Sequence, residues 1–364
     1  MKTRAAICVE PGHALEVDMV DVRGPGPGEV LIEIRASGLC HSDWHQISGD
    51  LPLYPYPIIV GHEGAGVVLE VGPGVSSVQP GDHVIPVSIP ECRQCAACTS
   101  GRTNLCSESF ASFSRTETPF SRNGQPIFMY SGVSTFANHT VVKEIAVVKI
   151  RDDAPFGTVC CAGCAVITGV GAVFKTAAVR PQSSVAVFGI GGVGLNILQA
   201  ARMAGATKII AVDINPARLE IAQQFGASHC VNPKTIDCDL VAHLQALTGG
   251  GADFSFECVG IPQLMLQAIE TVRPGWGVSV AVGAAGMDNP VQVPSFAILS
   301  GRTWKGSLLG DVRPRTELPG IVDLYMDGHL DVDSLVTHRL PLERINEGFE
   351  LMRRGEAIRA VIEF

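Results

Sequence analysis

Four cysteines stand close together in the chain, at Cys92, Cys95, Cys98 and Cys106. Four thiolates at this spacing can enclose a tetrahedral zinc ion without help from distant residues. Disulfides and an iron–sulfur cluster are the alternatives, but no signal peptide and no electron-transfer motif accompanies the run. Because cysteine fills all four positions, we interpret the run as a closed, structural zinc site.

A second group of metal-binding side chains is dispersed. Residues 40–45 place a thiol, a hydroxyl, a carboxylate and two imidazoles within six positions, and His62, Glu63 and Cys164 follow further along. Each of these is a weak signal alone, because a single buried cysteine or histidine is more often a core residue than a ligand. Spacing does not assemble them into one site.

A glycine-rich motif follows an apolar segment and opens a predicted helix. It reads Gly189-Ile190-Gly191-Gly192-Val193-Gly194. In this context the glycines allow a tight turn, close approach of a pyrophosphate, and close packing of helix on strand. Asp213 ends the next strand, where a carboxylate accepts from a ribose 2′-hydroxyl and favours NAD over NADP. Arg218, one helical turn later, is a further candidate contact to the adenosine ribose.

The elements that must position these residues change in character along the chain. Up to about residue 160 the sequence predicts short strands, such as 30–34 and 66–71, separated by glycine and proline. From about residue 166 short strands alternate with helices, which predicts a parallel sheet covered by helices. The expected strands are 185–188, 209–212, 253–256 and 277–282, and the expected helices are 195–203, 217–225 and 264–272. An amphipathic stretch at 345–352 and a strand at 360–364 close the chain.

Composition excludes several classes of protein. The chain of 364 residues has a formal net charge of −9 and only 17% charged residues, so it lacks the basic surface of a nucleic-acid-binding protein. Its apolar stretches are of strand length, which predicts no membrane span. With 12 cysteines and no predicted signal peptide, we expect a cytoplasmic protein that uses its thiols for metal binding.

Several motifs together resemble the zinc-dependent medium-chain alcohol dehydrogenases. The signature is Gly61-His62-Glu63-Gly64-Ala65-Gly66, followed by Gly72 and Val75. Further motifs resemble the family and occur in the same order along the chain. They are Cys40 with Ser42, Asp43 and His45, the four-cysteine run, Gly163-Cys164, the glycine motif, and 300–306. The resemblance extends over nearly the whole chain, to Ile358-Arg359-Ala360.

The family implies an α/β fold in which a GroES-like, β-rich catalytic domain is interrupted by a Rossmann domain. We therefore expect residues 1–165 and 309–364 to form the catalytic domain, with the structural zinc loop at 92–106. Residues 166–308 are expected to form the NAD-binding domain.

The resemblance also implies a catalytic site. Cys40, His62 and Cys164 would hold a catalytic zinc ion and leave a fourth position for the alcohol oxygen. Ser42 would take the alcohol proton and pass it through the cofactor ribose to His45, whose imidazole can release it. Asp43 would fix the tautomer of His62, and Glu63 would lie near the zinc on the side away from substrate.

Further family positions concern the cofactor. Thr168 and Val193 would pack against the nicotinamide, and Val282 also belongs to the cofactor site. His41 and Arg359 match positions that contact the pyrophosphate. His41 stands at a position where many animal members carry arginine. Cofactor binding at this position would therefore be weaker or pH-dependent. The expected cofactors are NAD and two zinc ions per chain.

Positions that differ from the usual family residues narrow the range of expected substrates. Glutathione-dependent formaldehyde dehydrogenases usually carry arginine where Phe110 stands, and usually lack a histidine at His45. Ser88 and Ala284 are smaller than the usual residues there. The expected pocket walls are Leu51, Ser88, Phe110, Tyr130, Ala284 and Leu308. We therefore expect an aromatic or otherwise bulky primary alcohol, with S-(hydroxymethyl)glutathione as the alternative.

Other properties stay open in the sequence. A catalytically silent NAD-binding or zinc-stabilised interaction protein is an alternative of another class, against which the intact Cys40, His62 and Cys164 set argues. The segment 107–129 is long, as it is in dimeric members of the family, so the resemblance implies a homodimer, with a tetramer as the alternative. The physiological substrate and the favoured direction do not follow from sequence.

Overall fold

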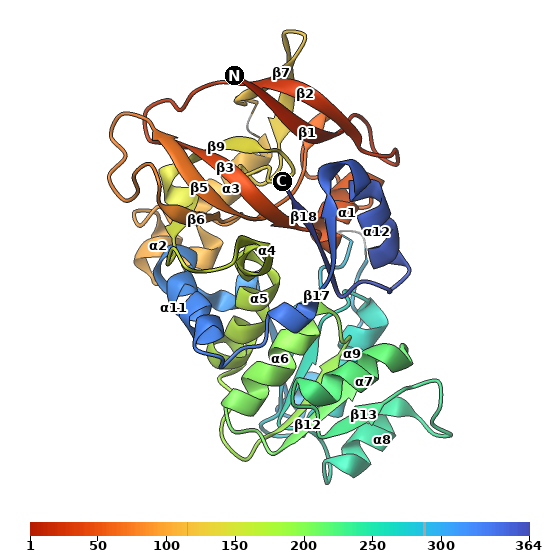
Figure 1. Ribbon diagram of the computed structural model, residues 1–364. Helices are drawn as coiled ribbons and strands as arrows, with labels where there is room; N and C mark the ends of the chain where they lie inside the picture. Colours follow the sequence, from red (N-terminus) through yellow and green to blue (C-terminus); the bar gives the residue numbers. More distant parts are fainter. Residues whose placement is uncertain (115, 287–288) are drawn as a thin grey trace. The chain divides into compact units, whose positions relative to one another are not determined.

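The computed structural model describes residues 1–114, 116–286 and 289–364, which form two compact units. The first unit comprises Met1–Cys164 together with Val312–Phe364, and the second comprises Ala165–Asp311. The chain therefore leaves the first unit and later returns to it. Figure 1 shows the consequence in the first unit, where the blue C-terminal strand β18 lies beside the orange strand β3.

A closed five-stranded barrel forms part of the first unit. Its strands are, in order around the barrel, β1 (Lys2–Cys8), β2 (Glu16–Val22), β7 (Phe120–Arg122), β8 (Gln125–Met129) and β4 (Ile58–Ile59). Side chains of a strand alternate between two faces. Ala5 and Ile7 pack into one core cluster, whereas Ala6 and Cys8 pack into another. The second half of β1, residues 5–8, is therefore buried on both faces, which explains why its side chains are apolar.

The second sheet of this unit brings the two ends of the chain together. Its order is β10 (Val147–Lys149), β6 (His83–Pro86), β5 (Glu63–Val71), β3 (Glu29–Gly38), β18 (Arg359–Glu363) and β17 (Val336–Pro341), and β9 (His139–Lys143) also pairs with β3. Strand β18 runs antiparallel to β3, with Val361 opposite Gly38. This pairing places Arg359 next to the segment that carries the dispersed metal-binding residues.

Short helices connect these strands. The α-helices of the first unit are α1 (His41–Ser48), α2 (Ala96–Thr99), α3 (Ser107–Ala111), α4 (Phe156–Val159), α11 (Pro314–Met326) and α12 (Ile345–Arg353). Its 3₁₀ helices are η1 (Thr103–Leu105), η2 (Ser112–Ser114), η3 (Glu144–Ala146), η4 (Cys160–Gly163), η7 (Asp333–Leu335) and η8 (Leu342–Arg344). Helix α12 coincides with the predicted amphipathic stretch and buries Ile345, Phe349 and Met352.

The second unit is a parallel sheet with helices, as its alternating sequence predicts. The strand order is β13 (His229–Val231), β12 (Lys208–Val212), β11 (Ser184–Phe188), β14 (Phe254–Glu257), β15 (Val278–Ala281) and β16 (Thr303–Gly306), and every neighbouring pair is parallel. The helices are α5 (Ala165–Gly171), the π-helix η5 (Ala172–Ala177), α6 (Gly192–Met203), α7 (Pro216–Gln224), α8 (Leu240–Leu247), α9 (Pro262–Thr271), α10 (Ser295–Leu299) and the 3₁₀ helix η6 (Leu309–Asp311). Figure 1 shows α6, α7 and α9 around the strands of this unit.

The structure adds elements that the sequence pattern did not predict. Strand β13 and helix α8 lie between the predicted helix at 217–225 and the predicted strand at 253–256. Helix α6 begins at Gly192, three residues before the predicted start at Leu195, so the glycine motif itself forms its first turn. The α/β class with a β-rich unit and a parallel-sheet unit is confirmed.

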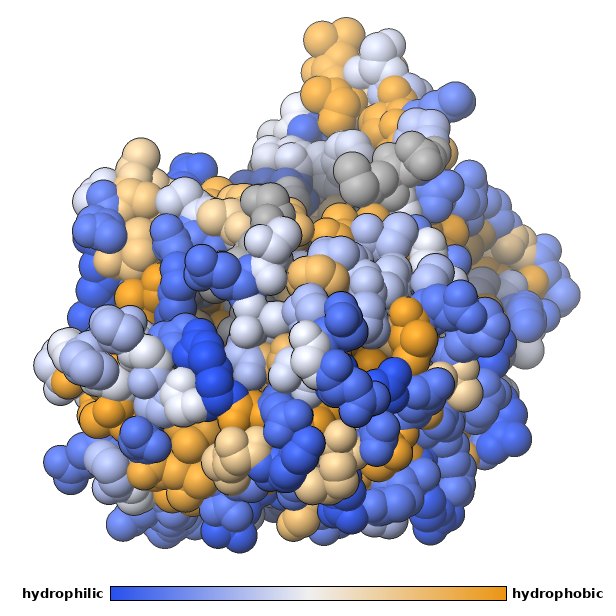
Figure 2. Space-filling model, turned by 90° about the horizontal axis from the view of Figure 1, so that it is seen from above, coloured by the Kyte–Doolittle hydropathy of each residue, from blue (hydrophilic) through white to orange (hydrophobic). Residues whose placement is uncertain are grey.

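Among the described residues, no single helix has the length and apolar character needed to cross a membrane. One bent pair, 156–163 with 165–177, passes that test only when the two helices are taken together. On the face shown in Figure 2, hydrophobic residues occur in separate groups between hydrophilic ones.

Candidate functional site

The dispersed metal-binding residues converge within the first unit. Cys40 lies at the N-terminal cap of α1, directly after β3, and His62 and Glu63 lie where β5 begins. Cys164 follows the 3₁₀ helix η4. Ligand atoms of Cys40, His62, Glu63 and Cys164 all lie within 4.8 Å of one another. Three segments of the sequence thus supply two sulfur atoms, one ring nitrogen and one carboxylate oxygen to a single site.

Strand β5 approaches its neighbours because its signature is rich in glycine. A Cβ atom on Gly66 would lie 2.0 Å from the carbonyl oxygen of Glu33 on β3, a contact that no side chain tolerates. A Cβ atom on Gly64 would lie 2.5 Å from Thr135 Cγ2. The signature therefore lets β5 pack close to β3, which holds His62 near Cys40.

A buried carboxylate orients the histidine. Asp43 Oδ1 lies 2.8 Å from His62 Nδ1 and also accepts from the backbone N–H of Gly61 at 3.0 Å. Asp43 Oδ2 accepts from the backbone N–H of Cys40. Although burial opposes the charged ring, the Asp43 carboxylate raises the pKa of His62 well above its usual value. With Nδ1 donating to Asp43, Nε2 of His62 is left to bind a metal ion.

The two sulfur ligands behave as a pair. The Cys164 side chain, followed by His62, holds the pKa of Cys40 well below its usual value, while the pKa of Cys164 is raised by the neighbouring Cys40 sulfur and by burial. Without a cation, only one of the two sulfur atoms is a thiolate. A bound metal ion would allow both cysteines to lose their protons. A soft divalent ion such as zinc suits two sulfur atoms and one imidazole.

Glu63 is a buried acid beside this cluster. Burial raises the pKa of Glu63 to about 7. Arg359 Nη2 lies 3.7 Å from Glu63 Oε1, and Arg359 Nη1 donates to the carbonyl oxygen of Leu39 at 3.2 Å. By the family resemblance, Arg359 was expected to contact the pyrophosphate. In the structure this arginine is buried next to Glu63.

Of the residues proposed to move protons, Ser42 lies next to the same cluster. Cys40 Sγ is 3.8 Å from Ser42 Oγ, and the Tyr130 hydroxyl donates to the backbone carbonyl of Ser42 at 2.9 Å. His45 is half-buried, with Nδ1 3.9 Å from an oxygen of the exposed Asp50. His41 is exposed at the start of α1.

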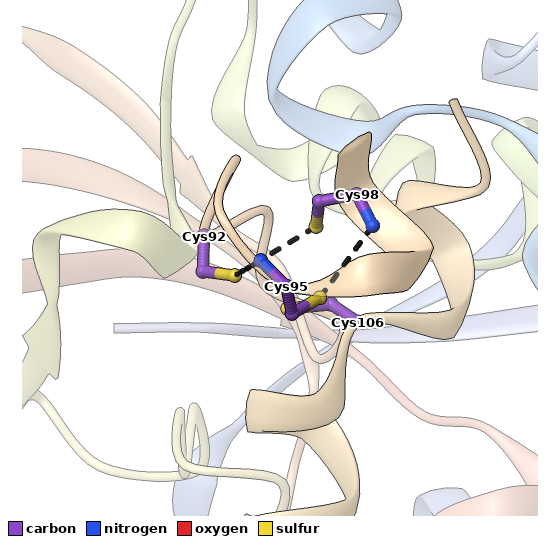
Figure 3. Close-up of side chains that lie close together, drawn as sticks. All are labelled: Cys92, Cys95, Cys98 and Cys106. Carbon is purple, nitrogen blue, oxygen red and sulfur yellow. Dashed lines mark hydrogen bonds between the residues drawn. The ribbon is translucent and has the colours of Figure 1, made fainter. Parts of the chain in front are cut away.

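The four-cysteine run forms a compact cluster of its own. Figure 3 shows the four sulfur atoms turned toward one another, and all lie within 4.8 Å of each other. Cys92 Sγ is 3.8 Å from Cys98 Sγ. Sulfur atoms about 2.3 Å from a tetrahedral zinc ion would lie about 3.8 Å apart. Backbone N–H groups of Cys95 and Cys98 point at Cys92 Sγ and Cys95 Sγ, respectively. The cluster therefore fits a structural zinc ion.

The glycine motif lies in the second unit, at the carboxyl end of β11. Gly189 has φ +90°, and a Cβ atom on Gly194 would lie 2.0 Å from the carbonyl oxygen of Gly189. Strand and helix can therefore pack this closely only with glycine at position 194. The N-terminus of α6 leaves free N–H groups at the turn, as a pyrophosphate requires. The site fits a dinucleotide.

Asp213 lies at the end of β12, next to this turn. Its Oδ2 accepts from the backbone N–H of Ile190 at 2.8 Å, and its Oδ1 accepts from that of Asn215 at 2.8 Å. Arg218 is half-buried, and its Nη1 would lie 3.6 Å from a Cβ atom on Gly191. Thr168, Val193 and Val282 also belong to this unit.

We expect Asp213→Gly to weaken the preference for NAD over NADP. In the glycine-motif pattern this carboxylate would repel a 2′-phosphate, and about 1.4 kcal/mol of lost repulsion corresponds to a factor of ten. The ratio of kcat/KM for NAD to that for NADP should therefore fall at least about tenfold. Asp237→Gly, at an exposed aspartate of the same unit, is the control. An unchanged ratio in Asp213→Gly would contradict the assignment.

The expected pocket residues are divided between the units. Leu51, Ser88, Phe110 and Tyr130 lie in the first unit, and Ala284 and Leu308 lie in the second. Tyr130 is buried with its ring centroid 5.8 Å from that of His62. Leu51 and Ser88 are half-buried, and Phe110 is 51% exposed.

Two aromatic residues near Tyr130 and His62 were not predicted from the sequence. The Tyr54 ring lies 5.1 Å from Tyr130, and the Phe113 ring lies 5.2 Å from Tyr54 and 6.1 Å from Phe110. Together these rings form a continuous series from His62 to the surface. No spacing in the sequence marks Tyr54 or Phe113, because their neighbours are brought in from distant segments.

Comparisons with known proteins identify the family. Residues 26–152 match the family model described as alcohol dehydrogenase GroES-like domain, and residues 192–326 match zinc-binding dehydrogenase. The chain is 50% identical to alcohol dehydrogenase class-3 of Cereibacter sphaeroides and 49% identical to S-(hydroxymethyl)glutathione dehydrogenase of Paracoccus denitrificans, with full coverage of both chains in each case. It also superimposes on the crystal structure of benzyl alcohol dehydrogenase from Acinetobacter calcoaceticus with a TM-score of 0.93 and 33% identity, covering 100% of this chain and 99% of that one.

The fold and the sites define a zinc-binding oxidoreductase that uses a nicotinamide dinucleotide. Full-length identity of about half to curated relatives, together with the two family models, decides the family. The chain belongs to the zinc-dependent medium-chain alcohol dehydrogenases. Its cofactors are zinc and NAD.

Proposed function

We propose that this alcohol dehydrogenase oxidises S-(hydroxymethyl)glutathione, the adduct of formaldehyde and glutathione, with NAD. The main support for this proposal is the full-length identity of 49% to a protein named for this activity and of 50% to a class-3 alcohol dehydrogenase. These relatives favour S-(hydroxymethyl)glutathione, the alternative substrate on sequence grounds, over an aromatic alcohol. The adduct presents a primary hydroxyl group, so its oxidation is the alcohol-to-aldehyde reaction of the family. We place the enzyme in the cytoplasm, where reduced thiols persist.

The residues of the first unit suit this chemistry. Cys40, His62 and Cys164 would hold the catalytic zinc ion, which supplies Lewis-acid chemistry that lowers the pKa of an alcohol hydroxyl. Ser42 is the proposed acceptor of the alcohol proton, and half-buried His45 is the proposed group that releases a proton to solvent. Asp43 holds the ring of His62 in place. We propose that 1–164 with 312–364 is the catalytic domain and that 165–311 binds NAD.

A bulky aromatic primary alcohol is the second candidate. The series of rings from Tyr130 through Tyr54 and Phe113 to Phe110 offers apolar surface close to His62. The benzyl alcohol dehydrogenase that shares this fold is consistent with it. Phe110 also carries no charge for a glutathione carboxylate. Ethanol uses little of this surface, so both candidates predict poor activity with ethanol.

Steady-state kinetics with three substrates separates the candidates. We expect kcat/KM for S-(hydroxymethyl)glutathione to exceed that for benzyl alcohol, and both to exceed that for ethanol. Formaldehyde without glutathione serves as the control for adduct recognition. A higher kcat/KM for benzyl alcohol than for the adduct would overturn the first proposal and support the second. The favoured direction follows from measuring aldehyde reduction with NADH in the same series.

We expect Ser88→Phe to narrow the substrate site. Burial of an aromatic ring contributes about 2 kcal/mol more than burial of a two-carbon chain, or about thirtyfold in kcat/KM. The benzyl alcohol to ethanol ratio should therefore fall by up to about thirtyfold in this variant. Ser76→Phe, at an exposed serine of the same unit, should leave the ratio unchanged. An unchanged ratio in Ser88→Phe would remove Ser88 from the pocket.

We propose that the protein is a homodimer formed through the second unit. Strand β16 is the edge of the parallel sheet, and all four of its residues are exposed. Edge strands with free backbone groups pair with another chain unless they are covered. Trp304 on this strand and the nearby Phe296 and Leu299 of α10 add exposed apolar surface, with Leu299 79% exposed. Sedimentation equilibrium tests the stoichiometry, and a monomer at micromolar concentration would contradict it.

A further inference from the structure

Glu257 is a buried acid that the proposed chemistry does not use. It is the last residue of β14, at the same end of the sheet as the glycine motif, and is 1% exposed. Burial raises the pKa of Glu257, although backbone N–H groups of Val259, Gly260 and Ile261 counteract this. Burial of a carboxylate costs free energy unless hydrogen bonds compensate for the lost water. The contacts of Glu257 show which groups provide these bonds.

Glu257 connects two loops at the carboxyl edge of the sheet. Its Oε1 accepts from the backbone N–H of Val259 and of Gly260, both at 2.8 Å. Its backbone carbonyl accepts from the N–H of Val282 at 2.8 Å and of Gly283 at 2.9 Å. One residue therefore fixes the loop after β14 by its side chain and the loop after β15 by its backbone.

These loops interlock with little tolerance. Gly260 has φ +87°, and a Cβ atom there would lie 2.1 Å from the carbonyl oxygen of Ala284. A Cβ atom on Gly283 would lie 2.2 Å from the backbone nitrogen of Gly260. Backbone lies against backbone at this point, so a small shift of the loop after β14 cannot be absorbed by side chains.

The loop after β14 also touches the dinucleotide-binding turn. A Cβ atom on Gly189 would lie 2.4 Å from Val259 Cγ2, and the backbone N–H of Cys258 donates to the carbonyl oxygen of Phe188 at 2.9 Å. Val259 thus packs against the first glycine of the motif on one side. It is 45% exposed on the other. An exposed apolar side chain held rigidly beside a phosphate-binding turn is a wall of a ligand site.

We propose that Glu257 is a positioning residue for the dinucleotide. Its carboxylate holds the Val259–Gly260 backbone so that Val259 lies against Gly189 and forms the wall of the dinucleotide site beside the turn. Geometry is the essential property, because Oε1 must reach two N–H groups at once. The proposal concerns NAD binding and is independent of which alcohol is oxidised.

Two conservative variants separate geometry from charge. Glu257→Gln keeps the length and an acceptor oxygen but removes the charge, whereas Glu257→Asp keeps the charge but shortens the side chain by one methylene. We expect the Kd for NADH, measured by fluorescence titration, to stay within about threefold of wild type in Glu257→Gln and to rise roughly tenfold in Glu257→Asp. The Tm without NADH is measured alongside.

Asp253 provides a matched control just before the opposite end of the same strand. Its Oδ2 accepts from the backbone N–H and the hydroxyl of Ser184, both at 2.8 Å. Asp253→Ala should lower the Tm but leave the Kd for NADH within about twofold. The proposal is overturned if Glu257→Asp binds NADH like wild type, if Glu257→Gln weakens binding as much as Glu257→Asp, or if Asp253→Ala weakens binding by the same factor.

Discussion

Replacing Cys164 by alanine is expected to leave one zinc ion per chain and to lower kcat at least about 10³-fold. Cys164 supplies one of the two sulfur atoms of the cluster with Cys40 and His62. Lewis-acid activation contributes several kcal/mol, and about 4 kcal/mol corresponds to a factor of about 10³. The structural zinc should remain, because the four-cysteine cluster is built from a separate segment. Elemental analysis and steady-state kinetics with a saturating alcohol check both expectations.

Cys160 offers a matched control. It is buried, lies four residues before Cys164 and is not part of either cluster of metal ligands. Cys160→Ala should keep two zinc ions and a kcat close to that of wild type. The assignment of the catalytic ligands is contradicted if Cys164→Ala keeps both zinc ions, or if both variants lose activity equally.

The two zinc sites differ in how far sequence alone can define them. The structural ligands fall within one short segment, so their spacing already indicates a shared metal. The catalytic ligands come from the end of β3, the start of β5 and the segment after η4, and Cys40 and Cys164 are 124 positions apart (164 − 40). Only folding of the first unit joins them. The family resemblance supplied what spacing could not.

The same distinction applies to the fold. The alternation of strands and helices predicted the parallel sheet of the second unit, because β11, β12, β14 and β15 are short, largely apolar runs between helices. The barrel of the first unit could not be predicted in this way, since β4 spans two residues and β7 spans three. Strands this short show no periodicity. Strand β4 pairs with the distant β1 and β8, and β7 pairs with the distant β2 as well as with its neighbour β8.

Contacts between distant residues were the least predictable feature of the site. Arg359 reaches Glu63 because β18 pairs with β3, and nothing in either segment indicates the other. The rings of Tyr54 and Phe113 are neighbours for the same kind of reason. Glu257 matters through backbone contacts that depend on three loop ends meeting. Sequence identifies groups capable of chemistry, and tertiary structure determines which of them face one another.

Replacing Cys95 by alanine is expected to destabilise the protein strongly while sparing its chemistry. A structural zinc ion contributes about 10–16 kcal/mol of binding free energy, and an incomplete ligand set forfeits several kcal/mol of it, so the Tm should fall by roughly 10 °C or more. None of the four cysteines belongs to the catalytic cluster. The kcat per folded molecule, measured well below the Tm, should therefore stay within about threefold of wild type. Thermal unfolding, zinc analysis and kinetics on the same preparation test this.

Removal of the same zinc ion should depend on pH. Backbone N–H groups of Ser107 and Cys98 lower the pKa of Cys95 to about 5, whereas burial raises the pKa of Cys98 to about 12. Zinc must therefore displace at least the Cys98 proton, and protons compete more strongly as the pH falls. A chelator should remove the structural zinc faster near about pH 6 than near about pH 8.

Cys238→Ala, at an exposed cysteine outside both clusters, should match wild type in Tm and zinc content. A wild-type Tm in Cys95→Ala, or a chelation rate that rises with pH, would contradict a structural zinc at these four cysteines.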